Sequence, residues 1–262
     1  MIIIKQSIAH MVTKFTPYLI ALLALLMTAS VPSPRPITVY LIGDSTIANK
    51  LTSAYPETGW GMPFKFFFDS TVTVDNRAKN GRSTRTFLSE NLWQPVADAL
   101  KEGDYVFIQF GHNDESKEKV DRYTAPDAYK QNLVRFITET RARKATPILL
   151  TPVSRRKFVD GKVIETHPAY SPLVIEVAKS QGVSLIDLDA KSRELYQSFG
   201  EESSKLLFLH LKPGEHPNYP DGKEDNTHFS ELGARKIAQI ILAEIKAQKL
   251  ALAERITKPV KK

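Results

Sequence analysis

Apolar residues gather in five short runs along the chain, and each run is bounded by polar or turn-forming residues. The runs are rich in β-branched residues and nearly continuous, as in strands of a parallel sheet that is covered on both faces. The predicted strands are residues 37–42, 72–75, 105–110, 147–151 and 183–187.

Between the strands, apolar residues recur at helical spacing. Helices are predicted at residues 92–101, 127–143, 173–180 and 230–253. In the last helix the stripe is a core-packing face made of Leu232, Ile237, Ile240, Ile241, Ile245 and Leu250. Strands that alternate with helices, without an internal repeat, predict a single α/β domain over residues 37–255.

The first residues show a different pattern. An uninterrupted apolar run at residues 18–27 follows Lys5 and Lys14, and small residues and a Pro-rich segment come after it. The run suits a signal peptide and is shorter than the ~20 residues that span a bilayer. We expect residues 1–30 to be a signal peptide and residues 31–36 a spacer, with a basic tail at 256–262. The mature protein would then be secreted or periplasmic, without stable membrane insertion.

Composition narrows the possible classes of function. The chain is 42% hydrophobic and 25% charged, which is usual for a globular protein. It has no cysteine, which excludes thiol catalysis, disulfides and metal sites built on cysteine. The net charge of +7 is compatible with an acidic substrate. No run of Lys and Arg is interleaved with aromatic residues, so nucleic acid is not an expected partner.

The first predicted strand ends in Gly43, Asp44 and Ser45. In open parallel sheets, ligands bind outside the carboxyl ends of the strands. Gly43 would allow a tight turn, and Ser45 would stand where a helix begins and backbone N–H groups are free. Ser45 could therefore be a nucleophile whose own N–H helps to bind an oxyanion. For a GDS motif on its own, a turn in which Asp44 or Ser45 caps a helix is the favoured explanation. The segment GDSTI lacks the second glycine of G-x-S-x-G, which argues against the nucleophile elbow of α/β-hydrolases.

Further polar residues follow the next two strands and precede the last helix. Gly81 belongs to an Asn-Gly turn dipeptide, and Asn113 lies in the cluster Gly-His-Asn-Asp. Asp225 stands three residues before His228, so its carboxylate can fold back on the imidazole and fix its tautomer. Asp225 could instead cap the helix. Together these residues are the parts of a hydrolytic site that must converge at one edge of the sheet.

The set of GDS, a glycine after the second strand, G-x-N-D and D-x-x-H resembles the four sequence blocks of the SGNH (GDSL-type) hydrolases. The resemblance implies a flavodoxin-like three-layer α/β/α fold with a parallel sheet of about five strands. It also implies Ser45 as nucleophile, His228 as base and Asp225 as the carboxylate that orients His228. The N–H groups of Ser45 and Gly81 and the amide of Asn113 would form the oxyanion hole. No metal or organic cofactor is implied.

A narrower resemblance rests on the segments GDST, GWG, NGRS, QFGHND, TPVSRRKF and DNTHF. These are similar to the rhamnogalacturonan acetylesterase branch, whose members remove acetyl groups from the galacturonate-containing backbone of pectin. Residues 165–170 depart from that pattern. The resemblance implies a serine esterase whose partner is an acetylated acidic polysaccharide or oligosaccharide.

Four arginines are candidates for binding such a substrate. Arg155 and Arg156 follow the fourth strand, and Arg82 and Arg85 follow the glycine turn. Arginine can hold a carboxylate through two parallel hydrogen bonds. Each of the four could equally be a solvated surface residue.

Three different functions stay open at this point. A related esterase, lipase or thioesterase acting on a lipid or other acyl ester would share the triad and differ in its pocket. His210, His216 and His228 could bind zinc, although their spacing matches no compact metal motif. A non-catalytic glycan-binding protein could stack sugars on Trp60 and Trp93. The residues suggest no role for His112 in the chemistry.

Overall fold

A computed structural model describes residues 35–257, so the predicted signal peptide, most of the spacer and residues 258–262 lie outside the described part. The central sheet has five strands in the order β2-β1-β3-β4-β7, and all neighbouring pairs are parallel. They are β1 (Ile37–Gly43), β2 (Val72–Asn76), β3 (Tyr105–Gln109), β4 (Thr146–Leu150) and β7 (Ser184–Ile186). This is the flavodoxin-like order, and the predicted fold class is confirmed.

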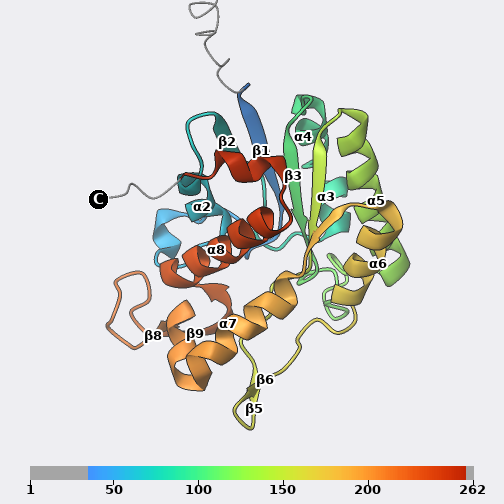
Figure 1. The fold of residues 1–262 in the computed structure, drawn as a ribbon. Coiled ribbons are helices and arrows are strands. Elements are labelled where there is room, and N and C mark those ends of the chain that lie inside the picture. Colours follow the sequence, from blue (N-terminus) through green and yellow to red (C-terminus); the bar gives the residue numbers. More distant parts are fainter. Residues whose placement is uncertain (1–34, 258–262) are drawn as a thin grey trace, which may run out of the picture. The chain divides into compact units, whose positions relative to one another are not determined.

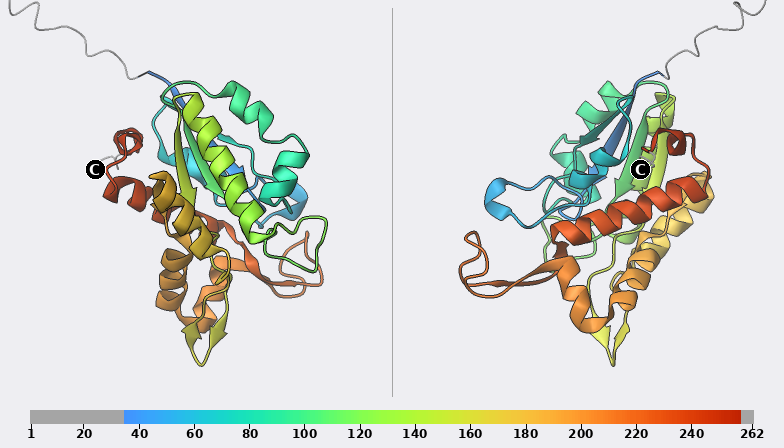
Figure 2. Two further views of the ribbon diagram at one scale, coloured as in Figure 1. Left: turned by 90° about the vertical axis from the view of Figure 1, so that its right-hand side faces the viewer. Right: turned by 60° about the vertical axis from the view of Figure 1, so that its left-hand side comes forward.

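The central strands β1, β3 and β4 are buried on both faces, which explains their continuous apolar runs, whereas the edge strands β2 and β7 are mostly half-buried. In β1, Val39 and Leu41 face one core cluster while Tyr40 and Ile42 face the other. The first cluster is covered by α2 (Gly61–Phe64), α7 (Leu188–Ser203) and α8 (Glu231–Ala247). The second is covered by α3 (Thr84–Ser89), α4 (Gln94–Ala99), α5 (Pro126–Ala142) and α6 (Ser171–Gln181). Figures 1 and 2 show these two helical layers on either side of the strands.

The last helix has a clear start and an early end. The Ser230 hydroxyl accepts a hydrogen bond from the Gly233 N–H at 3.2 Å and caps the first turn of α8. Ile237, Ile241 and Ile245 of the predicted stripe are buried, and Ile240 and Leu250 are half-buried against the same core. The prediction is wrong for Leu232, which lies in the first turn and is 43% exposed. The helix ends at Ala247, and a separate 3-10 helix, η4 (Ala251–Arg255), follows it. The predicted helix at 230–253 is therefore two elements.

Two hairpins were not predicted from the sequence. They are β5 (Phe158–Val159) with β6 (Lys162–Val163), and β8 (Phe208–Leu211) with β9 (Lys223–Phe229). The second hairpin matters because β9 carries Asp225 and His228, for which the sequence predicted only a position before the last helix. It projects beyond the sheet next to the amino-terminal end of α8 (Figure 1).

The packed domain extends past its predicted end at residue 255. Ile256 is buried at 7% exposure and bridges to Phe68, and the Thr257 N–H donates to the Phe67 carbonyl at 2.9 Å. Within residues 35–257, no helix is both long and apolar enough to cross a bilayer.

Candidate active site

The turn after β1 presents Ser45. A Cβ atom on Gly43 would lie 2.3 Å from the Gln109 carbonyl oxygen of β3, so glycine is needed there for close approach of the strands. The Asp44 carboxylate accepts hydrogen bonds from the Thr46 N–H at 2.9 Å and the Thr46 hydroxyl at 2.8 Å. These contacts fix the turn at the carboxyl end of the strand, where Ser45 is half-buried.

Ser45, His228 and Asp225 are joined by two hydrogen bonds. The Ser45 Oγ lies 2.9 Å from Nε2 of His228, whose Nδ1 lies 2.8 Å from Oδ2 of Asp225. With the Nδ1 proton donated to Asp225, Nε2 is left as the acceptor that faces the serine hydroxyl. The three residues predicted as a triad therefore have the geometry of one, and their catalytic roles stay predictions.

The surroundings of Asp225 keep it ionised. Burial of the carboxyl group would raise its pKa, but the hydrogen bond and charge of His228 together hold that pKa well below its usual range. The other carboxylate oxygen accepts the N–H groups of Thr227 at 2.7 Å and His228 at 2.9 Å. Asp225 can thus stabilise the imidazolium that forms when His228 takes a proton.

The predicted oxyanion-hole residues come from two different loops. Gly81 has a φ of +75°, a left-handed conformation that side chains rarely adopt. Asn113 is 8% exposed, and its amide nitrogen donates to the Arg82 carbonyl at 3.0 Å. Within residues 35–257 the second amide hydrogen has no acceptor, so it is available to a ligand.

Arg122 borders both of these residues and was not singled out from the sequence. Its Nη1 lies 3.4 Å from Oδ1 of Asn113, and a Cβ on Gly81 would lie 3.2 Å from the same nitrogen. The guanidinium therefore holds the Asn113 amide with its oxygen turned toward Arg122 and its nitrogen toward the Arg82 carbonyl. Arg122 lies in the long loop between β3 and α5, where no pattern marks individual positions.

A buried polar cluster lies behind the serine turn. His112 Nδ1 is 3.2 Å from Oδ2 of Asp44, and the rings of His112 and His167 are centred 4.4 Å apart. Burial lowers the pKa of His112 to about 4 despite the attraction of Asp44. His112 is therefore neutral at neutral pH and donates its Nδ1 proton to Asp44, which supports the turn that carries Ser45.

Arg155 and Arg156 are neighbours with different surroundings. Arg155 Nη1 donates to the Thr227 hydroxyl at 2.5 Å, next to His228, and its Nη2 lies 3.8 Å from Glu115. Arg156 is only 8% exposed, and its guanidinium donates to Ser204, Asn226 and the Glu201 carbonyl. The expected exposed position is wrong for Arg156, which instead fastens β9 to the end of α7.

The other two arginines are more open. Arg82 pairs with Glu90 at 2.8 Å and donates to the Asn80 carbonyl at 2.9 Å. Arg85 donates to the Val120 carbonyl at 2.6 Å. Substrate binding by Arg82, Arg85 and Arg155 stays a prediction.

The structure supports neither a zinc site at the histidines nor sugar stacking on the tryptophans. His210 bonds Asn226 at 2.9 Å, and His216 packs against the Tyr55 ring. Over residues 35–257, no three His, Asp or Glu side chains form a group that could hold a metal ion. Trp60 and Trp93 are both buried, at 0% and 1% exposure, so neither presents a face for stacking on a sugar.

Comparison with known proteins agrees with this geometry. Residues 41–236 match the sequence model of the GDSL-like lipase/acylhydrolase family. The chain belongs to this family. Its relatives include the rhamnogalacturonan acetylesterase RhgT of Bacillus subtilis, 40% identical over 85% of this chain and 95% of the relative. The probable rhamnogalacturonan acetylesterase YesY of the same organism is 36% identical over 84% and 97%.

A solved structure has the same fold. A catalytic mutant of the acetylxylan esterase Axe2 from Geobacillus stearothermophilus superposes with a TM-score of 0.58 at 18% identity. The match covers 80% of this chain and 94% of that one. The predicted family resemblance is thus confirmed, and the protein is a carboxylic ester hydrolase.

Proposed function

We propose that this protein is a rhamnogalacturonan acetylesterase, which hydrolyses acetyl esters on the galacturonate-containing backbone of pectin. The observation that carries the proposal is the hydrogen-bonded chain Ser45–His228–Asp225, in a protein 40% identical to an enzyme named for this activity. The similarity to RhgT extends over 95% of that relative, so it is not confined to the catalytic blocks.

The first half of the reaction forms an acetyl-enzyme. As the Ser45 Oγ attacks the acetyl carbonyl carbon, His228 Nε2 takes the hydroxyl proton. The N–H groups of Ser45 and Gly81 and the Asn113 amide hold the oxyanion, and one such donor contributes roughly 3–4 kcal/mol in related sites. The bond to the sugar oxygen then breaks, and that oxygen leaves with the proton from His228.

The second half releases acetate. Water attacks the acetyl carbon and gives a proton to His228 while the same donors hold the new oxyanion. The bond to Ser45 breaks as His228 returns its proton to the Ser45 oxygen, and the product leaves as acetic acid, which ionises to acetate in water. Throughout the cycle Asp225 stays ionised and keeps the imidazole in its orientation.

Positive charge supports an acidic substrate. Arg122 lies against the two oxyanion-hole residues outside the serine turn, and Arg155 touches the segment that carries His228. Uronate carboxylates on a bound polymer would be attracted to this edge. A lipid or neutral acyl ester would gain nothing from the same charges.

Acetate release tests the proposed function directly. The purified protein should deacetylate rhamnogalacturonan faster than acetylated xylan, chitin or a short aryl acetate. Ser45→Ala should lose both turnover and labelling by a fluorophosphonate probe, with an unchanged melting temperature. Preference for a long-chain acyl ester would overturn the pectin assignment. Wild-type activity in folded Ser45→Ala would overturn the serine mechanism.

We also propose that residues 1–30 direct export, because a cell meets pectin polymers outside its membrane and the segment has the pattern of a signal peptide. Amino-terminal sequencing of the protein recovered from the medium or periplasm should show cleavage near Ser30. Retention of the full chain in the cytoplasm would contradict this.

A further inference from the structure

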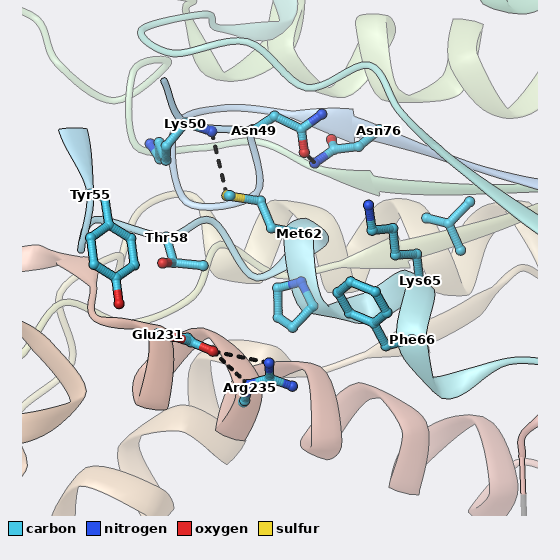
Figure 3. Close-up of a pocket in the computed structure, with 13 residues that line it drawn as sticks. Asn49, Lys50, Tyr55, Thr58, Met62, Lys65, Phe66, Asn76, Glu231 and Arg235 are labelled. Atoms are coloured by element: carbon cyan, nitrogen blue, oxygen red, sulfur yellow. Dashed lines mark hydrogen bonds and ion pairs between the residues drawn. The ribbon is translucent and has the colours of Figure 1, made fainter. Parts of the chain in front are cut away.

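Lys50 is a nearly buried cation whose contacts are complete. Its side chain is 2% exposed, and its Nζ lies 2.6 Å from the Ser45 carbonyl oxygen. The same nitrogen lies 2.9 Å from Oδ1 of Asn80 and 2.7 Å from Oε1 of Glu57. An ammonium group has three protons, and here three acceptors are within hydrogen-bond distance. Lys50 also lines a pocket of about 510 Å³ together with Met62 and Tyr55 (Figure 3).

The three acceptors lie on three separate segments around the candidate site. One is the backbone of Ser45 itself. The second is Asn80, the residue directly before the oxyanion-hole glycine. The third is Glu57, which precedes Thr58 in the chain. The Thr58 N–H donates to the carbonyl of Phe229 at 2.9 Å, and Phe229 directly follows His228. The Lys50 ammonium group therefore connects the loop of Ser45, the loop of Gly81 and the segment that pairs with β9, the strand that carries His228.

We propose that Lys50 is a positioning residue that sets Ser45 in register with the oxyanion hole and with His228. A charged donor makes hydrogen bonds about twice as strong as neutral ones. Oxyanion donors act only within about 2.7–3.1 Å of the developing charge, and misplacement by 1 Å can cost about 10² in rate. The inference rests on the serine-esterase mechanism of the proposed function, but not on the identity of the polymer.

Stabilisation of the fold is the competing explanation for this ion pair. Removing one partner of a buried pair destabilises a protein because the other charge is left unpaired. Replacing both partners avoids that penalty, and it can be neutral. The double variant Lys50→Met/Glu57→Gln therefore separates positioning from folding. Lys144 and Glu102 form an exposed ion pair at 3.1 Å near the amino ends of β3 and β4, and Lys144→Met is the matched control.

The decisive experiment measures kcat and KM for a neutral aryl acetate and the labelling rate of Ser45 by a fluorophosphonate. In the folded double variant, kcat and the labelling rate should both fall about 10²-fold, with KM little changed. Asn80→Leu should lower both in the same direction, whereas Asn80→Asp, which keeps an acceptor oxygen, should retain most of the rate. Lys144→Met should behave as wild type.

A double variant with the wild-type melting temperature, kcat and labelling rate would overturn the proposal. So would a loss of melting temperature alone. Because labelling needs no sugar, it tests Lys50 even if the wild type releases no acetate from rhamnogalacturonan. That second result would remove the pectin assignment and leave Lys50 untouched. Failure of the wild type to be labelled at all would overturn both.

Discussion

Hydrogen-bond partners fix the charge or the orientation of single side chains in this site. Asp225 accepts two backbone N–H groups and the imidazole Nδ1, so its charge and orientation are both set. Asn113 is fixed between an acceptor, the Arg82 carbonyl, and a donor, Arg122, which determines which end of its amide carries the hydrogens. Reactivity at this scale depends on these assignments, and each can be tested by a substitution that preserves shape.

Asp225→Asn should keep the geometry and disturb the proton. The amide can donate to Nδ1, which favours the tautomer whose Nε2 carries a proton and cannot accept one from Ser45. We expect kcat to fall by roughly 10²- to 10⁴-fold. Steady-state kinetics and a melting curve decide the matter. If the melting temperature drops and kcat does not, Asp225 acts only by capping its turn.

Asn113→Ala should remove one oxyanion donor. Since its amide binds the developing charge more strongly than the neutral carbonyl, kcat should fall about 10²- to 10³-fold with little change in KM. The variant also frees the Arg82 carbonyl, so the melting temperature is measured beside the kinetics. A large rise in KM at constant kcat would make Asn113 a residue of ground-state substrate binding.

His112 should make stability depend on acid. Burial lowers its folded pKa to about 4, while the unfolded value is about 6.5. Between these values only the unfolded chain takes up the proton, so the free energy of unfolding falls as the pH drops from about 6.5 to about 4. The loss amounts to about 3 kcal/mol across that interval and is absent above it.

His112→Gln lacks this proton uptake and serves as the comparison. Asp114, whose pKa burial raises to about 7, is present in both proteins. Burial would raise the pKa of Asp44 and the hydrogen bond from His112 helps to lower it to about 2, and the glutamine amide can donate in place of that bond. Urea unfolding at pH 7.5 and pH 4.5 should show the wild type losing stability relative to His112→Gln. A constant difference between the two proteins at both pH values would contradict the buried neutral histidine.

The helices and strands differ in how well the pattern of apolar residues in their sequence predicts them. The five sheet strands were predicted to within a residue. Burial on both faces explains the continuous apolar runs of the central strands, whereas the half-buried edge strands β2 and β7 were found from shorter runs with β-branched residues. β9 escaped prediction because its sequence, KEDNTHF, is polar and does not alternate. Its pairing with β8 and with Thr58 depends on contacts between distant segments. The α7 helix was also missed, although its first turn is capped by Asp187.

The candidate site divides in the same way. Ser45, Gly81 and Asn113 follow predicted strands, so the sheet topology alone brings them to one edge. Asp225 and His228 were found through their three-residue spacing and the family resemblance. Arg122 and Lys50 leave no local pattern, because their roles come from what their long side chains meet in other loops. The adjacent residues Arg155 and Arg156 illustrate the same limit, since only one of them is buried.

Gly43→Ala should disturb the pairing of β1 with β3. The added methyl group would lie 2.3 Å from the Gln109 carbonyl oxygen and 2.3 Å from Ile47 Cδ1, and the backbone oxygen cannot turn away. We expect a loss of about 1–3 kcal/mol in the free energy of unfolding, and a lower kcat because Ser45 shifts with the strand end. Denaturant unfolding and kinetics on an aryl acetate measure the two effects.

Gly161→Ala is the control for backbone strain alone. Gly161 has a φ of +73° with open space around it, in the turn between β5 and β6. Its replacement should cost about 1–2 kcal/mol without altering kcat. Equal kinetic effects in the two variants would mean that the close approach of Gly43 to β3 does not position the nucleophile.

The whole molecule combines a rigid parallel sheet with a site built from its loops. Ser45, Gly81 and Asn113 lie in the loops that follow β1, β2 and β3, whereas the proposed base and orienting acid lie on a hairpin that Arg156 and Thr58 hold in place. Around this edge, the guanidinium groups of Arg122 and Arg155 lie 3.5 Å and 3.8 Å from their acidic partners, farther than the 2.8 Å of Arg82 and Glu90, and Arg85 donates to a backbone carbonyl. Charge at this scale acts on how a polymer approaches rather than on the bond that breaks.

Activity on an acidic polymer should therefore depend on salt. Raising ionic strength from about 0.01 M to about 0.15 M shortens the screening length from about 30 Å to about 8 Å. For acetylated pectin fragments kcat/KM should fall, while for a neutral aryl acetate it should stay constant.

Arg155→Gln should raise KM for the acidic fragments about tenfold, as expected for one charge-assisted hydrogen bond, and leave aryl acetate turnover unchanged. Arg143→Gln removes the same charge near the opposite ends of the strands, where Arg143 pairs with Asp98 at 3.4 Å, and should have little effect. If both arginine variants weaken pectin turnover equally, only the net charge matters, and if neither does, uronate recognition does not lie at this edge.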